Sequence, residues 1–254
     1  MYNFQLSEER LRFQEMTRKF AEKEVKPLND KFEDDWASHR YMPQVLKKAA
    51  QLGFLGLPIE PKYGGVGADG MTIMVVLEEL AAVNGGAACV IGDTWFAQTP
   101  IIMAGNEEQR ERFLRPLASR EEVNLGCICM TEPPSGADIE DDRMRLRTLR
   151  TIIKEEGDHY IINGVKAWPS NAGIASHYVV VATIEPKLED KGSAVIVVEK
   201  DRLGLSFGKI ERKMGMVEDQ NREVIFENVR VPKSNLLGKI GDGHQLLQRT
   251  IAYN

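Results

Sequence analysis

The sequence predicts an α+β protein with a helical N-terminal part and a compact β part after it. Three observations predict this order. Apolar residues recur at helical spacing through the first third, short β-branched runs alternate with turns from about residue 123, and a further helix begins after the last run. We therefore expect a helical domain over 1–122, a β domain of barrel or sandwich type over 123–235, and the start of another helical domain over 236–254.

The helices of the first region have start and stop signals. Ser7 is suited to cap a helix whose first turn is acidic, and Pro27 is expected to end that helix. Pro43 and Gly53 bracket a second helix. After a loop rich in Pro and Gly, three more helices are predicted: residues 71–83, residues 87–103 after a separating Gly85–Gly86 pair, and the amphipathic segment NEEQRERFLRPLA at 106–118.

Six β-branched runs predict the strands of the second region. Asn163–Gly164 predicts a hairpin turn inside one run, because both residue types tolerate a positive φ. Pro232 is expected to end the last strand, before a turn and the final helix. The runs are LGCICM (125–130), LRTIIKEE (149–156), HYIINGVKAW (159–168), HYVVVATI (177–184), SAVIVVEK (193–200) and EVIFENVRV (223–231).

Composition excludes several classes of protein. The 254 residues carry a net charge of -5 and are 43% hydrophobic, so a real core is expected and a nucleic-acid partner is not. No apolar run reaches the roughly 20 residues that a membrane span needs, and the N-terminus lacks the features of a secretory signal. Three cysteines in a chain of this length indicate a reducing compartment, so we predict the cytoplasm, with the mitochondrial matrix as the location of a mature form.

Two patterns that suggest a metal or a nucleotide are better interpreted structurally. Cys127 and Cys129 would share one face of a strand, but the sequence offers no second pair, so we interpret them as small buried hydrophobes and predict no metal site. GVGADG at 65–70 matches G-x-G-x-x-G, a pattern that requires a strand directly before it. Helices are predicted on both sides here, so we interpret the segment as a Gly-rich loop.

Two stretches at the ends of predicted strands could face a ligand. MTEPPSGADIE (130–140) enters a turn-rich loop, where Thr131 offers a hydroxyl and Gly136 permits unusual backbone angles. NGVKAWPSNAG (163–173) carries Trp168 and Ser170 two apart, which would face the same way on an extended chain. An indole can cover a planar ligand beside a hydroxyl. The alternatives are an ordinary surface turn and a core Trp followed by a turn Ser.

Taken together, six stretches resemble the acyl-CoA dehydrogenase family, in the family's order and over nearly the whole chain. MTEPPSGAD is similar to T-E-P-x-x-G-S-D, and YIINGVKAWPSNA is similar to Y-x-I-N-G-x-K-x-W-I-T-N. The other four are LPIEPKYGGVGADG (57–70), LEELAAVNGG (77–86), AGNEEQRERFLRPLASRE (104–121) and VIFENVRVPKSNLLGKIGDG (224–243). The resemblance implies an N-terminal helical domain, a middle β domain and a C-terminal four-helix domain.

The resemblance also implies FAD as cofactor and an acyl-CoA thioester as the substrate of a dehydrogenation that creates a Cα=Cβ bond, as in fatty acid or carboxylic acid metabolism. An electron-transfer flavoprotein is the implied electron acceptor. The Ser170 hydroxyl is expected near flavin N5. The flavin contacts implied by the two motifs are Ile128, Met130, Thr131, Gly136, Ala137, Trp168, Pro169 and Ser170.

The sequence departs from the family pattern at several of these positions. Ala137 replaces a Ser that commonly meets substrate or flavin, and Pro169 replaces a residue with a backbone N–H. Substrate contacts are expected at Ala137 and Asn254. Asn254 stands where one branch of the family carries its catalytic Glu, and Asn cannot act as that base. No residue is therefore assigned as catalytic, and the base is expected in a C-terminal domain absent from this sequence.

These departures lead to further expectations. The chain is expected to be a fragment or a split subunit, forming a homo-oligomer or joining a chain that supplies the C-terminal domain. The apolar face of its last helix, formed by Leu246, Leu247 and Ile251, is expected to lack a partner. The alternative functions on this scaffold are an acyl-CoA oxidase, a flavin monooxygenase and a non-catalytic structural subunit.

Overall fold

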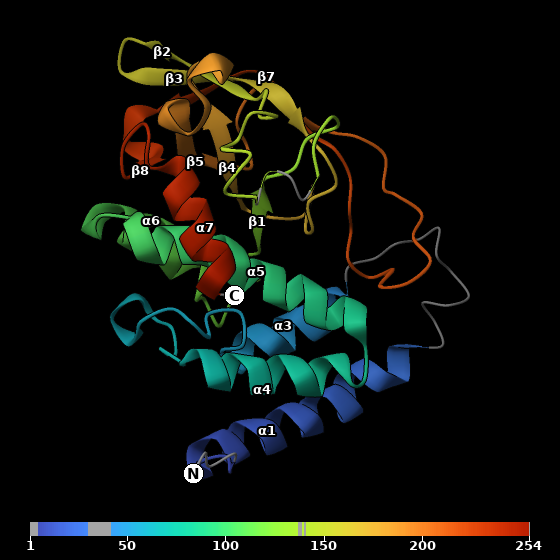
Figure 1. Cartoon of the computed structure of the whole chain (residues 1–254). Coiled ribbons are helices and arrows are strands. Elements are labelled where there is room, and N and C mark those ends of the chain that lie inside the picture. Colours follow the sequence, from blue (N-terminus) through green and yellow to red (C-terminus); the bar gives the residue numbers. More distant parts are fainter. Residues whose placement is uncertain (1–4, 30–41, 137–138, 140, 254) are drawn as a thin grey trace.

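The computed structural model describes residues 5–29, 42–136, 139 and 141–253. Helices from the first half of the chain occupy the lower half of Figure 1 and the strands occupy the upper half. The last helix, α7 (Gly243–Tyr253), returns to cross α5 (Gly85–Ala104). The architecture is therefore α+β, as predicted. None of the helices within the described ranges combines the length and apolar character that crossing a membrane requires.

The first helices follow the sequence signals with one exception. The Ser7 side chain caps α1 (Glu8–Phe20) by accepting the Arg10 N–H. Pro27 does not itself end this helix, because a π-helical turn (Ala21–Val25) and a 3₁₀ turn (Lys26–Leu28) carry the chain past Phe20. Pro27 fits there because it stands near the start of the 3₁₀ turn, where an N–H is not needed. The helix α3 (Pro43–Gln51) begins and ends as predicted.

Three longer helices follow the Gly-rich loop. Asp69 caps α4 (Gly70–Ala81) by accepting the Thr72 N–H, so GVGADG is a loop before a helix, as interpreted. The Gly85–Gly86 pair does not separate helices but forms the first turn of α5, which is capped by Asn84. A capping box between Asn106 and Gln109 starts α6 (Glu107–Leu117).

One mixed sheet forms the β part, with strand order β6-β7-β3-β2-β4-β5-β8 and β1 paired to β4. β1 pairs in parallel with β4 over His177–Val180. On the same edge of β4, β2 pairs only at Thr183. The strands are β1 (Gly126–Cys129), β2 (Ile152–Glu156), β3 (His159–Lys166), β4 (His177–Thr183), β5 (Ser193–Glu199), β6 (Leu205–Phe207), β7 (Val224–Pro232) and β8 (Leu236–Leu237). The short strands β6 and β8 were not predicted.

Both faces of the central strands are buried. Along β4, Tyr178 and Val180 belong to one core cluster, whereas Val179 and Val181 belong to a second cluster that includes residues of α5, α6 and α7. This alternation follows from the period-two geometry of a strand. Cys127 and Cys129 lie fully buried on one face of β1, which confirms their interpretation as small hydrophobes.

The Asn163–Gly164 hairpin prediction was wrong. Both residues lie inside β3, at a bulge where the register with β7 shifts between Ile162 and Gly164. The turn that joins β2 to β3 contains Gly157 instead. Gly164 has φ +153°, and a Cβ there would lie 2.6 Å from the Thr151 hydroxyl, so the glycine serves close backbone packing and not a chain reversal.

The apolar face of α7 does have a partner, contrary to expectation. Leu246 and Leu247 are buried in the cluster shared with the sheet and α5, and Ile251 packs against it. The sequence could not reveal this contact, because the partner elements lie far from α7 in the chain. The helix α5 also meets β1, where Gly126 allows the approach: a Cβ there would lie 2.7 Å from the Ala97 Cβ.

Candidate functional site

Two strand-end segments that the sequence assigned to one ligand are hydrogen-bonded to each other. The Ala167 N–H donates to the Thr131 carbonyl over 2.9 Å, and the Thr131 hydroxyl donates to the Ala167 carbonyl over 2.7 Å. Thr131 follows β1, and Ala167 follows β3. Residues 130–132 and 167–170 therefore form one continuous border, which we call the rim.

The predicted contact residues differ in what they can offer a ligand. Ile128 is only 7% exposed and its side chain lies in the core, so its backbone alone could face a ligand. Met130 and Thr131 are half-buried. Gly136 is exposed, and a Cβ there would meet no atom within 4 Å. Ala137 and Asn254 lie outside the described residues.

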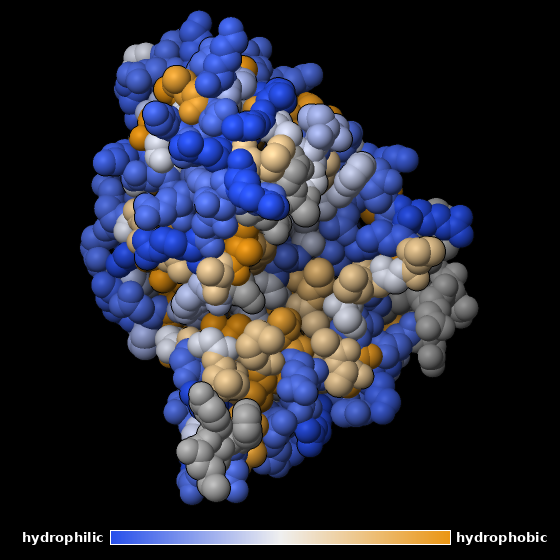
Figure 2. Space-filling view, viewed as in Figure 1, coloured by the Kyte–Doolittle hydropathy of each residue, from blue (hydrophilic) through white to orange (hydrophobic). Residues whose placement is uncertain are grey.

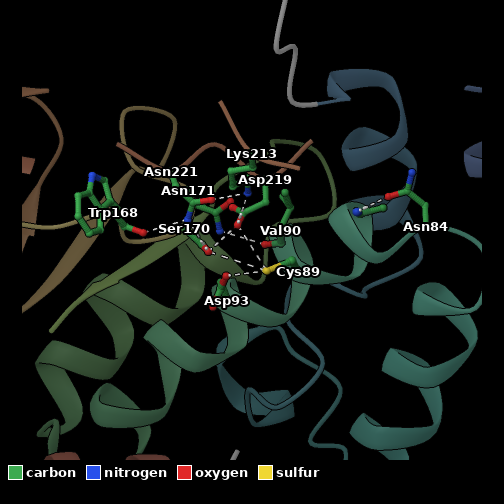
Figure 3. Close-up of polar contacts among 11 residues, drawn as sticks. Asn84, Cys89, Val90, Asp93, Trp168, Ser170, Asn171, Lys213, Asp219 and Asn221 are labelled. Atoms are coloured by element: carbon green, nitrogen blue, oxygen red, sulfur yellow. Dashed lines mark hydrogen bonds and ion pairs between the residues drawn. The ribbon is translucent and has the colours of Figure 1, made fainter. Parts of the chain in front are cut away.

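Trp168 and Ser170 point in different directions, contrary to expectation (Figure 3). Trp168 has φ +55°, so the chain is not extended there, and its side chain is 54% exposed. The Ser170 hydroxyl turns inward and donates to Asp219 over 2.8 Å. The Asn221 amide holds both residues by donating to the Trp168 carbonyl at 2.9 Å and to the Ser170 hydroxyl at 3.3 Å.

A buried ion pair supports the rim from behind. The Lys166 ammonium donates to Glu132 at 2.8 Å and to the Met130 carbonyl at 2.9 Å, and the Lys166 and Glu132 side chains are 0% and 1% exposed. Glu132 also accepts the backbone N–H groups of Arg150 and Thr151. Burial lowers the pKa of Lys166, while Glu132 opposes that shift. Burial would raise the pKa of Glu132, but Lys166 and Thr151 hold it below its usual value.

A second polar cluster lies between α5 and the loop after β6, and the sequence did not predict it. The Cys89 thiol lies 3.3 Å from Asp93 and 3.5 Å from Asp219, and Lys213 lies 3.2 Å from the same Asp219 oxygen, Oδ2. Asp219 is 3% exposed, yet its other oxygen, Oδ1, has no hydrogen-bond partner among the described residues. Figure 3 shows these side chains converging with Ser170.

Burial raises the pKa of both Cys89 and Asp93 in this cluster, and the Asp219 charge adds to each shift. The Cys89 sulfur and oxygens of Asp93 and Asp219 lie within 4.8 Å of one another, a spacing that could hold a metal ion. The Lys213 ammonium already supplies positive charge there, and a thiol of raised pKa is a poor ligand. We therefore assign no metal.

A cavity of about 380 Å³ lies next to this cluster, between α4, α5 and the end of α7. Asp93 is its one charged lining residue among otherwise mostly apolar ones such as Leu77 and Phe96. Apolar side chains gather on the surface over this part of the molecule (Figure 2). Met71, Met74 and Tyr253 contribute exposed apolar surface there. The arrangement can bind an apolar group beside a carboxylate.

Comparisons with known proteins agree on one family. Two models of it match: "Acyl-CoA dehydrogenase, N-terminal domain" over residues 7–121 and "Acyl-CoA dehydrogenase, middle domain" over residues 127–229. A short-chain specific acyl-CoA dehydrogenase of Clostridium acetobutylicum is 33% identical over 250 residues, which are 98% of this chain and 63% of the relative. The chain thus spans less than two thirds of that relative's length.

Two solved structures are similar. One, described as the electron transferring flavoprotein of Acidaminococcus fermentans, matches with a TM-score of 0.90 and 33% identity, covering 99% of this chain and 63% of that one. The other, an acyl-CoA dehydrogenase from Bacillus anthracis complexed with FAD, matches with a TM-score of 0.84 and 31% identity, covering 99% of this chain and 41% of that one.

Proposed function

Because this chain belongs to the acyl-CoA dehydrogenase family, we propose that it contributes flavin- and thioester-binding surfaces to an FAD-dependent oxidoreductase. The proposed reaction removes an α-proton and a β-hydride from an acyl-CoA and leaves a Cα=Cβ bond. FAD, when bound, supplies the hydride acceptor that no side chain can provide.

The observation that carries this proposal is the rim. Two segments that the resemblance assigns to the same flavin are 36 residues apart at Thr131 and Ala167, yet they exchange two hydrogen bonds. The residues present suit a large planar ring. Trp168 offers an exposed indole, Thr131 keeps a lone pair free for a ring N–H, and open space surrounds Gly136. We propose that Met130, Thr131, Gly136 and Trp168–Ser170 contact FAD.

The cavity supports the thioester half of the proposal. An acyl chain is apolar, and burying it between α4, α5 and α7 would exclude water from the reacting carbons. We keep Ala137 and Asn254 as proposed substrate contacts. We propose no catalytic base among the described residues, since the resemblance places that residue in the family's C-terminal helical domain.

We also propose the partners that the family implies. These are an electron-transfer flavoprotein as acceptor and an oligomer, either of this chain or with a chain that supplies the C-terminal helices. The similarity to the structure described as an electron transferring flavoprotein supports the first partner. The three free cysteines, Cys89, Cys127 and Cys129, support a reducing location such as the cytoplasm or the mitochondrial matrix.

Flavin titration tests the proposal. The purified chain, with any subunit that copurifies, should bind FAD and quench its fluorescence. Trp168→Ala should weaken binding by roughly ten-fold or more, because an indole packed on a ring contributes more than its area, and Thr131→Ala should weaken it less. The matched control is Leu203→Ala, which truncates a side chain 94% exposed on a turn outside the rim and should leave binding unchanged. Equal affinity in all four proteins would refute the proposed contacts.

Pro169 favours one second candidate, an oxidase on the same scaffold. Proline removes a backbone N–H from the rim, so the ring would meet fewer donors than the family pattern provides. The rate at which dioxygen reoxidises the reduced protein separates the candidates. A rate fast enough to sustain turnover without another acceptor would favour the oxidase, and a slow rate would favour the dehydrogenase.

A further inference from the structure

Among the described residues that line the cavity between α4, α5 and α7, mostly apolar ones, Asp93 carries the one charged side chain. Asp93 is the only charged residue in the 20 residues of α5. Its carboxylate receives a hydrogen bond from the Cys89 thiol. Ser170 and the Lys213 charge oppose the burial that raises the pKa of Asp93, but Lys213 forms its ion pair with Asp219. A half-buried carboxylate without an ion-pair partner of its own is costly to keep ionised. A purely hydrocarbon ligand would leave that cost in place.

A second carboxylate in the same cluster, Asp219, has one oxygen to which no described residue donates a hydrogen bond. Asp219 is 3% exposed, and its Oδ2 accepts from Ser170, Lys213 and Cys89, whereas no group in the described part of the chain bonds its buried Oδ1. Oxygens of the two carboxylates, Asp93 and Asp219, lie within 4.8 Å of each other, and one ammonium group, that of Lys213, forms an ion pair with Asp219. The cluster offers more acceptors than donors. Among these carboxylates, Asp93 lines the cavity and Asp219 does not, so a ligand there would bring a donor to Asp93.

We infer that the acyl group bound in this cavity carries a hydrogen-bond donor, an amino or a hydroxyl group, and that Asp93 selects for it. The inference rests on the proposed function and extends it, because it specifies the substrate class. The apolar walls would hold the hydrocarbon part of the chain. The Asp93 carboxylate would accept from the polar group and, with an ammonium, would gain an ion-pair partner of its own.

Binding of three thioesters with four-carbon acyl chains tests the inference. Butyryl-CoA, 4-hydroxybutyryl-CoA and 4-aminobutyryl-CoA differ only at the end of the chain. Calorimetry on the FAD-loaded protein, with any copurifying subunit, should show the two polar thioesters binding at least about ten-fold more tightly than butyryl-CoA, the gain of one hydrogen bond to a charged group. A stronger preference for the amino compound would identify the donor as cationic. A stronger preference for the hydroxyl compound would identify it as neutral.

Two variants identify the residue responsible. Asp93→Leu should abolish the preference for both polar thioesters and keep or improve butyryl-CoA binding. Asp93→Asn keeps an acceptor without the charge, so it should lose the amino preference and retain part of the hydroxyl preference. Asp201→Asn changes an exposed turn and should behave as wild type. The Asn variant keeps the shape of the side chain, and its thermal melting curve verifies folding.

The failures are distinguishable. If butyryl-CoA binds wild type as tightly as the polar thioesters, or if the preference survives in Asp93→Leu, the inference is wrong while the proposed function stands. If none of the three binds at all, the thioester half of the proposed function is wrong and the inference falls with it.

Discussion

Two buried carboxylates, Glu132 and Asp219, lie near the same rim and are held in opposite ways. The Glu132 oxygens are shared among the Lys166 ammonium and two backbone N–H groups, and the partner lysine is itself fully buried. Within the described ranges, one Asp219 oxygen has hydrogen-bond donors and the other has none, and the side chain of its lysine partner, Lys213, is 24% exposed. Both oxygens of Glu132 therefore have hydrogen-bond donors among the described residues, whereas only one oxygen of Asp219 does.

The difference separates structure from ligand binding. A closed ion pair beneath the rim fixes the main chain of Met130, whose carbonyl also accepts from Lys166. Both side chains of the pair are buried, so a ligand cannot reach them. The cluster of Cys89, Asp93 and Asp219 holds its members less completely and borders a cavity, so its remaining capacity can be used by a bound molecule. Matched substitutions in the two regions should therefore change the free energy of unfolding by different amounts, and the pH dependence of stability should have opposite signs in the two regions.

The largest effect is expected from Glu132→Gln. The substitution keeps the shape and removes the charge that balances Lys166, so a fully buried ammonium loses its counter-ion. The free energy of unfolding should fall by about 3–5 kcal/mol, measured by urea denaturation. Glu132→Gln combined with Lys166→Met should recover a good part of the loss. A loss below about 1 kcal/mol in the single variant would mean that the pair is not an essential support.

Asp219→Asn makes the same chemical change in the incomplete cluster and should cost much less. The loss of the Lys213 ion pair is offset by relief of repulsion with Asp93, and Lys213 can turn toward solvent. We expect a change of about 1 kcal/mol or less in the same denaturation experiment. A loss of stability as large as that of Glu132→Gln would show that both carboxylates support the fold equally. It would contradict the proposed difference between the two regions.

A pH series should separate the regions by sign. The folded pKa of Glu132 lies below its ordinary 4.5, so its contribution is present above that pH and is lost as the pH falls. The folded pKa of Asp93 lies above its ordinary 3.8, so the native state holds a proton longer than the unfolded chain and stability declines as the pH rises through that window. Asp93→Asn should therefore be slightly more stable than wild type at neutral pH. Urea midpoints between about pH 3 and about pH 8 measure both trends, and equal slopes in wild type and Asp93→Asn would contradict the second.

The smallest effect is expected where a carboxylate and its partner are both near the surface. Asp141 accepts from Arg143 two residues away, and this contact holds the pKa of Asp141 at about 2. Solvent screens such a pair, so Arg143→Ala should leave the thermal midpoint within experimental error. A clear drop in the thermal midpoint would show that an exposed ion pair also stabilises this protein. Burial would then not be what decides how much an ion pair contributes to stability.

The parts of the fold that the sequence predicted are those encoded locally. Ser7 and Pro43 mark helix starts through their own chemistry, and the β-branched runs gave six of the strands. Asn163–Gly164 misled because the same residue pair suits a turn and a bulge, and only the neighbouring Thr151 decides between them. The partner of the α7 apolar face was equally invisible, because it depends on elements distant in sequence.

The candidate site divides in the same way. The two rim segments were found from motifs, but the directions of Trp168 and Ser170 were not, because the positive φ at Trp168 is a tertiary property. Asp219 lies 130 residues from Cys89, and nothing in its surroundings marks it. Asp93 could have been noticed in the sequence, because it is the single charged residue of a long apolar helix. A charged residue is seldom buried unless it is paired, so such a position indicates an ion pair or a functional role.

The hydrogen bonds between Thr131 and Ala167 have a consequence for local opening. Each of the two segments ends a strand, and neither can leave its position without breaking the contact that holds the other. The rim therefore belongs to one cooperative unit and opens as a whole. Amide hydrogens on both sides of it should exchange with solvent at a common rate, so a molecule that contacts either segment alone would protect both.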